Sequence, residues 1–360
     1  MKIYKIALYP GDGIGMEVVP EAVKTLDAVS QACGFGLEYC EFDWGCGYYD
    51  REGKVVPDDY LDVLSGFDAI FLGALGDPDH LADHITLKPL IEIRQSFDQY
   101  ACIRPATLMP GVATPLVGRQ AKEIDMLVLR ENSEGEYLDV GGFLKRQTPD
   151  GVAVQVALHS RKGIERVLRY GFKLAQQRRG RLTMTTKSNA LKYGMVFWDD
   201  VLEEVKQDYP DIEADKCHVD ALAMNFVRCP QQYDVVVASN LFGDILSDLA
   251  GAITGGLGLA PSANVNPEKR FPSLFEPVHG SALDIAGKNV ANPIGAIRSA
   301  AMMLDFLGQR QAADMIDQAV ESSLESGSAK TADLGGSATT TDVGNDIAAR
   351  IEASAAEPQP

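Results

Sequence analysis

Hydrophobic and polar positions along the chain alternate between two periods, which predicts strands interleaved with helices. Residues 5–10 form a short apolar run, and the turn GDGIG joins it to residues 16–33, where apolar positions recur at helical spacing. Further apolar or alternating runs predict strands at residues 67–74, 124–132, 152–160, 181–189 and 233–240. Amphipathic runs predict helices at residues 58–65, 87–99, 161–178, 291–308 and 312–326. This alternation is typical of an α/β fold.

Two aspartates four residues apart follow the buried-strand run VVVAS. The next segment, LFGDILSDLAG, is predicted to be a helix, on which positions i and i+4 share one face. Asp244 and Asp248 then point the same way and repel each other unless a cation lies between them. Oxygen ligands suit Mg²⁺ or Mn²⁺. The alternative is a solvated helix face, where such acid pairs are frequent.

Composition excludes several classes of function. A net charge of −18 over 360 residues makes nucleic acid an unfavourable partner and means that an anionic substrate needs a local basic pocket. The six cysteines form no CxxC pair, so we expect reduced thiols of a cytoplasmic protein. We expect neither a signal peptide nor a membrane span, because the chain enters a strand directly and no apolar run is long enough.

The turn GDGIG resembles a dinucleotide-binding fingerprint but does not complete it. The pattern G-x-G-x-x-G requires glycine at position 16, where this chain has Met16. We therefore reject a Rossmann fold and expect the glycines to turn the backbone tightly beside a ligand.

Three arginines occur in distinctive settings. Arg94 lies in a predicted helix, Arg104 precedes Pro105, which is expected to end regular structure, and Arg130 lies at the end of a predicted strand. A lone arginine is more often a surface or ion-pair residue. Together the three would clamp two carboxylates of one small molecule.

Three proton-carrying side chains also lie beside predicted strands or helices. Tyr137 ends RENSEGEY, Lys187 lies in TTKSNAL, and Asp220 lies in KCHVDALAMNF. Loops at strand ends often carry chemistry, and a lysine near a metal can act as a base. Asp220 could complete a metal site. For Tyr137 and Lys187 the alternative is a solvated loop tip.

Residues 251–264 are rich in glycine, and residues 275–293 contain His279 and Asp284 among small and turn-forming residues. The His-Gly-Ser turn exposes backbone N–H groups that suit a phosphate or a nucleobase. Asp284 could accept hydrogen bonds from two ribose hydroxyls and would repel a 2′-phosphate, which favours NAD over NADP. The alternative is a loop that connects two helices.

With these motifs the chain resembles the β-decarboxylating dehydrogenases, the relatives of isopropylmalate and isocitrate dehydrogenases. The resemblance extends from GDGIG to DLGGSATTTDVG and rests on NLFGDILSD, GLAPSAN, IRQSFDQYACIRP and FEPVHGSALDIAGKNVANP. Within the family, RENSEGEY, TTKSN and PSANVNPEKRFPSLFEPVHGS are most similar to the tartrate and D-malate dehydrogenase branch.

The resemblance implies two α/β domains that are not Rossmann folds, with the active site in the cleft between them. Residues 1–100 and 255–360 would form the cofactor-side domain, and residues 101–254 a central domain for dimerisation and metal binding. The implied partners are a small dicarboxylate substrate and a second copy of the chain. The implied cofactors are NAD and Mg²⁺ or Mn²⁺, and a K⁺ requirement stays open.

The resemblance also implies a role for each candidate residue. Arg94, Arg104 and Arg130 would hold the substrate carboxylates, and Asp244 and Asp248 would bind the metal. Asp220 and Lys187 would come from the neighbouring subunit, as metal ligand and as the base for the substrate hydroxyl. Tyr137 would protonate the enol carbon. The NAD site would be lined by Ile14, Asn189, Glu276, His279, Gly280, Ser281, Ala282, Asp284, Ile285 and Asn292.

One segment departs from the branch. HITLKPLIEIR, residues 84–94, is about one residue shorter than is usual there and carries Lys88. In the family this segment contacts the substituent on C3 of the substrate, so Leu90 and Ile91 leave 3-isopropylmalate as an alternative to D-malate or tartrate, with isocitrate favoured less. A non-catalytic regulatory subunit is a third hypothesis. It is disfavoured because the Tyr, Lys and Asp residues are all present.

Overall fold

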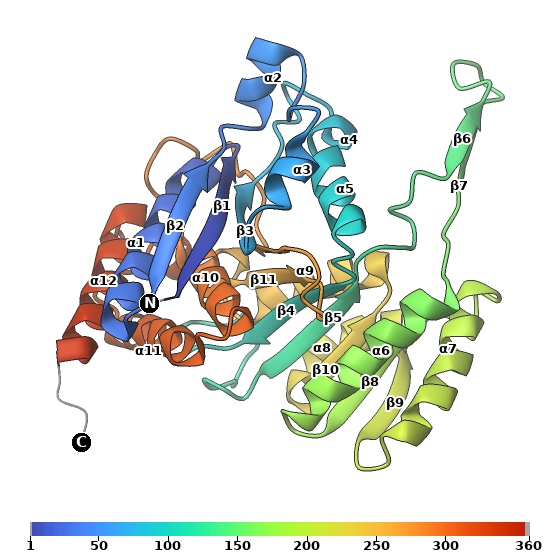
Figure 1. Cartoon of the computed structure of the whole chain (residues 1–360). Coiled ribbons are helices and arrows are strands. Elements are labelled where there is room, and N and C mark those ends of the chain that lie inside the picture. Colours follow the sequence, from blue (N-terminus) through green and yellow to red (C-terminus); the bar gives the residue numbers. More distant parts are fainter. Residues whose placement is uncertain (1, 357–360) are drawn as a thin grey trace.

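A ten-stranded sheet runs through the molecule in the computed structural model, which describes residues 2–356 (Figure 1). The strand order is β2-β1-β3-β12-β11-β4-β5-β10-β8-β9. Strands β11 and β4 pair antiparallel with their neighbours, and the other pairs are parallel. The sheet strands are β1 (Ile3–Gly11), β2 (Gly36–Glu41), β3 (Ala69–Ala74), β4 (Ala101–Thr107), β5 (Asp125–Glu131), β8 (Arg181–Thr186), β9 (Glu213–His218), β10 (Val235–Ala238), β11 (Pro261–Val265) and β12 (Ser273–Pro277).

Helices cover both faces of this sheet, which confirms the α/β architecture. They are α1 (Gly15–Cys33), α2 (Cys46–Glu52), α3 (Tyr60–Leu64), α4 (Asp83–Thr86), α5 (Lys88–Ser96), α6 (Arg161–Gln176), α7 (Gly194–Val205), α8 (Val219–Arg228), α9 (Asn240–Ile253), α10 (Ile294–Phe306), α11 (Arg310–Ser326) and α12 (Thr340–Ala356). Each predicted helix is present, with boundaries shifted by a few residues.

Helices α6 and α9 lie on opposite faces of β5 and β10. A Cβ added at Gly171 of α6 would lie 2.6 Å from Val237 and 3.3 Å from Leu129, so α6 packs on the face that carries these side chains. Gly243 of α9 lies against Arg130, which points to the other face because neighbours along a strand alternate. Burial on both faces explains why these strands consist of continuous apolar runs.

Segments from the two ends of the chain lie side by side. Helix α1 packs against α10 and α12 beside strands β1–β3 (Figure 1). This arrangement is compatible with a domain built from residues 1–100 and 255–360, and the boundaries with 101–254 stay a prediction.

The glycine-rich and loop segments contain strands that the pattern analysis missed. Residues 261–265 and 273–277 form β11 and β12, and every residue of both strands is buried. The predicted strand at 152–160 is shorter, since regular pairing covers only Val152–Gln155. Short strands between turn residues have too few positions for a clear period.

Pro105 corrects another expectation, because it lies inside β4 and does not end it. Pro105 lies opposite Leu127 of β5. The backbone N–H of Leu127 donates to the carbonyl of Asp234, directly before β10, and therefore points away from β4. The nitrogen of Pro105 therefore faces away from β5, and on that side β11 pairs only as far as Ile103. Proline fits here because no ladder bond needs its missing N–H.

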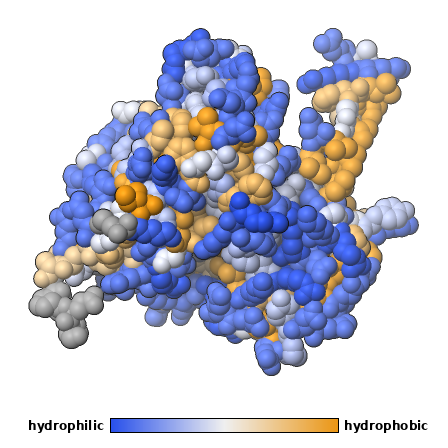
Figure 2. Space-filling model, in the orientation of Figure 1, coloured by the Kyte–Doolittle hydropathy of each residue, from blue (hydrophilic) through white to orange (hydrophobic). Residues whose placement is uncertain are grey.

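A two-stranded arm projects from the rest of the molecule (Figure 1). It consists of β6 (Gly141–Leu144) and β7 (Val152–Gln155), and every residue of both strands is exposed. Its apolar side chains are visible as the orange surface of the projection in Figure 2. Phe143 is 62% exposed and Leu144 64%, which is unfavourable unless another surface covers them.

Two further findings bear on the composition analysis. All six cysteines are free thiols. Within residues 2–356, no helix combines the length and the apolar character needed to cross a membrane.

Candidate active site

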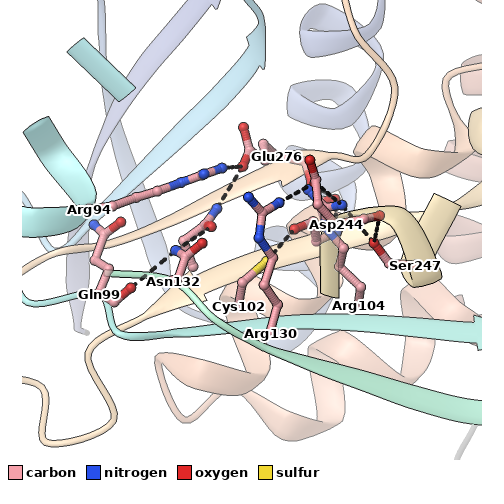
Figure 3. Close-up of polar contacts among 12 residues, drawn as sticks. Arg94, Gln99, Cys102, Arg104, Arg130, Asn132, Asp244, Ser247 and Glu276 are labelled. Carbon is pink, nitrogen blue, oxygen red and sulfur yellow. Dashed lines mark hydrogen bonds and ion pairs between the residues drawn. The ribbon is translucent and has the colours of Figure 1, made fainter. Parts of the chain in front are cut away.

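Asp244 lies at the centre of a charged cluster between α9 and the sheet (Figure 3). Its Oδ1 accepts hydrogen bonds from Arg130 Nη1 and, at 3.2 Å, from Arg104 Nη1. Its Oδ2 accepts a hydrogen bond from the Tyr137 hydroxyl at 2.7 Å. One turn later, Asp248 Oδ1 lies 3.7 Å from the same nitrogen of Arg104. The two aspartates thus share one helix face, and two of the three predicted arginines reach it.

The strand register and one glycine create this cluster. Arg104 of β4 is directly opposite Val128 of β5, and Arg130 lies two residues further along, so both arginines leave the same face. A Cβ added at Gly243 would lie 2.6 Å from the Cβ of Arg130. Only glycine therefore lets α9 approach closely enough for Asp244 to reach Arg130.

Buried polar groups fix the chain that leaves β5. The Glu131 carboxylate is 2% exposed and accepts hydrogen bonds from the backbone N–H groups of Ser133 and Glu134, each at 2.9 Å. Asn240 accepts from Arg130 Nε at 2.9 Å and donates to the carbonyl of Glu134 at 2.8 Å. Glu131 and Asn240 were missed by the sequence analysis, although both lie inside motifs it quoted.

The local electrostatics differ between the two aspartates. Burial raises the pKa of Asp244, but Arg130 and Arg104 outweigh it and hold that pKa below its usual value. Burial also raises the pKa of Asp248. The Arg104 charge lowers this pKa and the Asp244 charge raises it, and the net pKa lies above its usual value. Burial raises the pKa of Tyr137 as well, so its hydroxyl carries its proton at neutral pH. Asp248 is therefore the carboxylate with the least compensating positive charge.

Two carboxylates on one half-exposed helix face fit a hard divalent cation but do not complete its ligand set. In the part of the chain that the structure describes, no three Asp, Glu, His or Cys side chains gather as a metal-binding group. Further oxygen ligands must come from outside this cluster: from water, a substrate or a second copy of the chain.

Arg94 reaches the same region from α5 through a different carboxylate. Its Nη2 donates to Glu276 Oε1 at 3.0 Å (Figure 3). Asn264 Nδ2 donates to the same oxygen at 2.7 Å. Arg94 and Glu276 are each 7% exposed, so the pair is buried. A buried charge of this kind is tolerated only when it is paired.

A cavity of about 140 Å³ connects the predicted substrate residues with the predicted cofactor residues. Of the predicted site residues, its wall includes Leu90, Arg94, Arg104, Glu276, His279 and Gly280. Another part of the wall is apolar and consists of Leu72, Leu75 and Leu87. The Nε2 atom of His279 is buried without a hydrogen-bond partner in the protein. Such a nitrogen is free to bond a ligand or a water molecule.

The loop after β12 packs on the first turn of the chain. Ile14 N–H donates to the carbonyl of Ser281 at 2.8 Å. The Glu17 carboxylate accepts hydrogen bonds from the backbone N–H groups of Gly287 at 2.5 Å and Asn289 at 2.8 Å. The structure thus places Ile14 against the loop that carries His279, Gly280, Ser281, Ala282, Asp284 and Ile285, directly after Glu276 of β12. Asn292 lies further along the chain, where its Nδ2 donates to Asp333 at 3.0 Å. Glu17 is a residue of this region that the sequence analysis missed.

Lys187, Asn189 and Asp220 form a separate group. Lys187 Nζ donates to Asp220 Oδ1 at 2.7 Å, and this bond lowers the pKa of Asp220. Lys187 and Asn189 follow β8, at the same carboxyl edge of the sheet as α9. Strand β8 lies five strand spacings from β12, roughly 24 Å. Within one chain, Asn189 therefore lies with Lys187 and not with the cofactor loop, and its predicted role in NAD binding stays a prediction.

Comparison with known proteins identifies the family of the chain. Residues 5–347 match the family described as isocitrate/isopropylmalate dehydrogenase. The chain is 51% identical to the D-malate dehydrogenase [decarboxylating] of Escherichia coli, over 96% of this chain and 98% of that protein. It is 47% identical to the tartrate dehydrogenase/decarboxylase of Pseudomonas putida, over 97% of this chain and 99% of that one.

A solved structure gives the same result for the fold. The isocitrate dehydrogenase of Methylococcus capsulatus superposes with a TM-score of 0.89 at 36% identity, covering 97% of this chain and 99% of that one. These matches confirm the predicted fold class and the predicted enzyme class, a decarboxylating dehydrogenase. The chain belongs to the isocitrate/isopropylmalate dehydrogenase family.

Proposed function

We propose that this enzyme catalyses the NAD-dependent and divalent-metal-dependent oxidative decarboxylation of a (2R)-hydroxy diacid, D-malate or tartrate. The observation that carries the proposal is the cavity that joins Arg94 and Arg104 to Glu276 and His279, beside the Asp244–Asp248 face. Two relatives with about half of their residues identical are named for these two substrates. D-malate would give pyruvate and CO₂.

The side chains divide the work between binding and proton transfer. Arg94, Arg104 and Arg130 would bind the two carboxylates of the substrate, because guanidinium groups suit paired carboxylate oxygens. Asp244 and Asp248 would hold Mg²⁺ or Mn²⁺. When bound, the cation would stabilise negative charge on the substrate oxygens and NAD would accept the hydride.

Proton transfer would use Lys187 and Tyr137. Lys187 of a second copy would take the proton of the substrate hydroxyl. Tyr137 would protonate the carbon that loses CO₂, a role that its retained proton supports. Its hydroxyl bonds Asp244 and its ring lies 4.9 Å from the Arg130 guanidinium, so it adjoins the charged cluster.

We propose that the enzyme works as a homodimer with shared active sites. The exposed apolar arm of β6 and β7 supports an interface with a second copy. Asp220 is 67% exposed at its side chain and would complete the metal site of the partner. The domain division into 1–100 with 255–360 and 101–254 is part of this proposal. The free cysteines support a cytoplasmic location.

A second substrate is favoured by one observation. The cavity has an apolar wall that would also suit the isopropyl group of 3-isopropylmalate. This wall consists of Leu72, Leu75, Leu87 and Leu90. Lys88 does not line the cavity: its side chain is 69% exposed, and its Nζ lies 3.7 Å from Glu92 Oε1.

The test is NADH formation with Mn²⁺ and K⁺, comparing kcat/KM for D-malate, L-tartrate, meso-tartrate, 3-isopropylmalate and isocitrate. EDTA and Asp248→Asn should each abolish activity, whereas Asp314→Asn, on the exposed face of α11, should not. Activity that survives EDTA or Asp248→Asn would overturn metal dependence. A preference for 3-isopropylmalate would select the second substrate.

A further inference from the structure

Asp12 bonds the backbone on both sides of Leu75, a residue of the cavity wall. The backbone N–H of Asp12 donates to the carbonyl of Ala74 at 2.8 Å. Its carboxylate Oδ2 accepts a hydrogen bond from the backbone N–H of Gly76, also at 2.8 Å. Leu75 lies between these two partners and lines the cavity of about 140 Å³. One residue therefore fixes the chain before and after Leu75.

A second bond holds the Asp12 carboxylate itself. The residue is 8% exposed, and its Oδ1 accepts a hydrogen bond at 2.8 Å from the backbone N–H of Cys46, the first residue of α2. A Cβ added at Gly45 would lie 2.7 Å from this oxygen, so glycine lets the chain approach it closely. A buried carboxylate is tolerated only when its oxygens are bonded. The two bonds therefore connect α2 to the loop after β3 through one fixed group.

The side chain of Leu75 packs on the turn that carries Asp12. A Cβ added at Gly11 would lie 3.1 Å from Leu75 Cδ2, and Gly11 has a φ of +73°, which favours glycine. Leu75 is half-buried and also contacts the hydrophobic cluster around β1 and β3. The turn and the core thus support the leucine, which has little room to move aside for a larger ligand.

We propose that Asp12 is a positioning residue for Leu75 and that Leu75 limits the size of the group on C3 of the substrate. Both roles rest on the proposed function, in which Arg94 and Arg104 hold the carboxylates of a diacid. The carbon between the carboxylates then faces the rest of the wall, where Leu75 belongs to the apolar part. In a cavity of about 140 Å³ the position of one leucine changes a large share of the space. With Leu75 held in place, the wall favours the hydrogen or hydroxyl of malate or tartrate over an isopropyl group.

The test measures kcat/KM for D-malate divided by kcat/KM for 3-isopropylmalate. In Leu75→Ala this ratio should fall at least tenfold, because one methylene in an apolar pocket changes discrimination about 10–200-fold. Asp12→Asn keeps the size of the side chain but has one acceptor oxygen for two N–H groups, and its ratio should fall at least threefold. In the double variant the ratio should equal that of Leu75→Ala within twofold, because the effect of Asp12 passes through Leu75.

A matched control separates positioning from general support of the strands. Asp68 Oδ2 accepts the backbone N–H of Lys5 at 2.8 Å at the other end of the β1–β3 pair, and Asp68→Asn should keep the ratio within twofold. An unchanged ratio in Asp12→Asn, additive effects in the double variant, or loss of the thermal unfolding transition in Asp12→Asn would overturn the positioning role. An unchanged ratio in Leu75→Ala would overturn the size limit. NADH formation from neither diacid by the wild type would instead overturn the proposed function.

Discussion

Gly243→Ala should strongly lower the activity of the enzyme, although alanine is the better helix former. In an exposed helix interior the change would stabilise by about 1 kcal/mol. Here the new Cβ would lie 2.6 Å from Cβ and 2.7 Å from Cγ of Arg130, where carbon atoms normally stay about 3.5–4.0 Å apart. Arg130 is 2% exposed, so it has no free space into which to move.

The size of the effect follows from this clash. Overpacking of this kind costs about 1–3 kcal/mol, so the net change in the free energy of unfolding should be a loss of up to about 2 kcal/mol. To relieve the clash, Arg130 and α9 must separate by about 1 Å, and a misplacement of that size lowers reaction rates about 100-fold. We therefore expect a small fall in Tm and a fall in kcat/KM of about 100-fold.

The assay is NADH formation together with thermal unfolding. The matched control is Gly251→Ala on the same helix, where the new Cβ would meet the flexible end of Leu257 at 3.0 Å and Ala260 Cβ at an ordinary contact distance of 3.7 Å. The control should keep its activity and its Tm. Activity of Gly243→Ala within threefold of the wild type would refute the close approach of α9 to Arg130 as the cause of the Asp244 geometry.

Three further predictions concern the cofactor loop, pH and the arm. Glu17→Gln should raise KM for NAD about tenfold and leave KM for the diacid unchanged, because an amide has only one oxygen to accept hydrogen bonds from the two loop N–H groups. Equal changes in both KM values would contradict this prediction. Burial lowers the pKa of His159 below its ordinary 6.5. As pH falls below about 6.5, His159 therefore binds a proton more readily in the unfolded chain than in the folded one, and the free energy of unfolding should fall. His159→Gln should have a shallower slope in acid, and equal slopes would exclude His159 as the cause. Phe143→Asp with Leu144→Asp should convert a dimer into a monomer in light scattering, whereas a variant that stays dimeric would show that the arm is not the interface.

Local patterns predicted the elements with strong periodicity and failed where the period was short. Helix α9 and strands β5 and β10 were predicted because their apolar runs are long or continuous. Strands β11 and β12 are buried on both sides but have only five residues each, and glycine-rich or turn-like neighbours hide them.

The candidate residues were found by motif, but their mutual contacts were not. Arg104 and Arg130 are 26 positions apart in the chain, and no spacing rule places them on one sheet face. That contact depends on the antiparallel register of β4 and β5. Glu17 and Asn240 have the same origin, since each bonds groups more than a hundred positions away that only folding brings near. Glu131 differs, because it bonds the N–H groups of Ser133 and Glu134, two and three residues further on.

By itself the sequence determined the α/β class, the shared face of Asp244 and Asp248, and the family, because periodicity and motifs are local properties of the chain. Only the tertiary structure decided that Arg104 and Arg130 are buried on Asp244, that Arg94 pairs with Glu276, and that Lys187 lies with Asp220. Such pairings depend on strand order, register and the close approach of a helix at Gly243. These are set by burial of the whole sheet between helices and not by neighbouring residues.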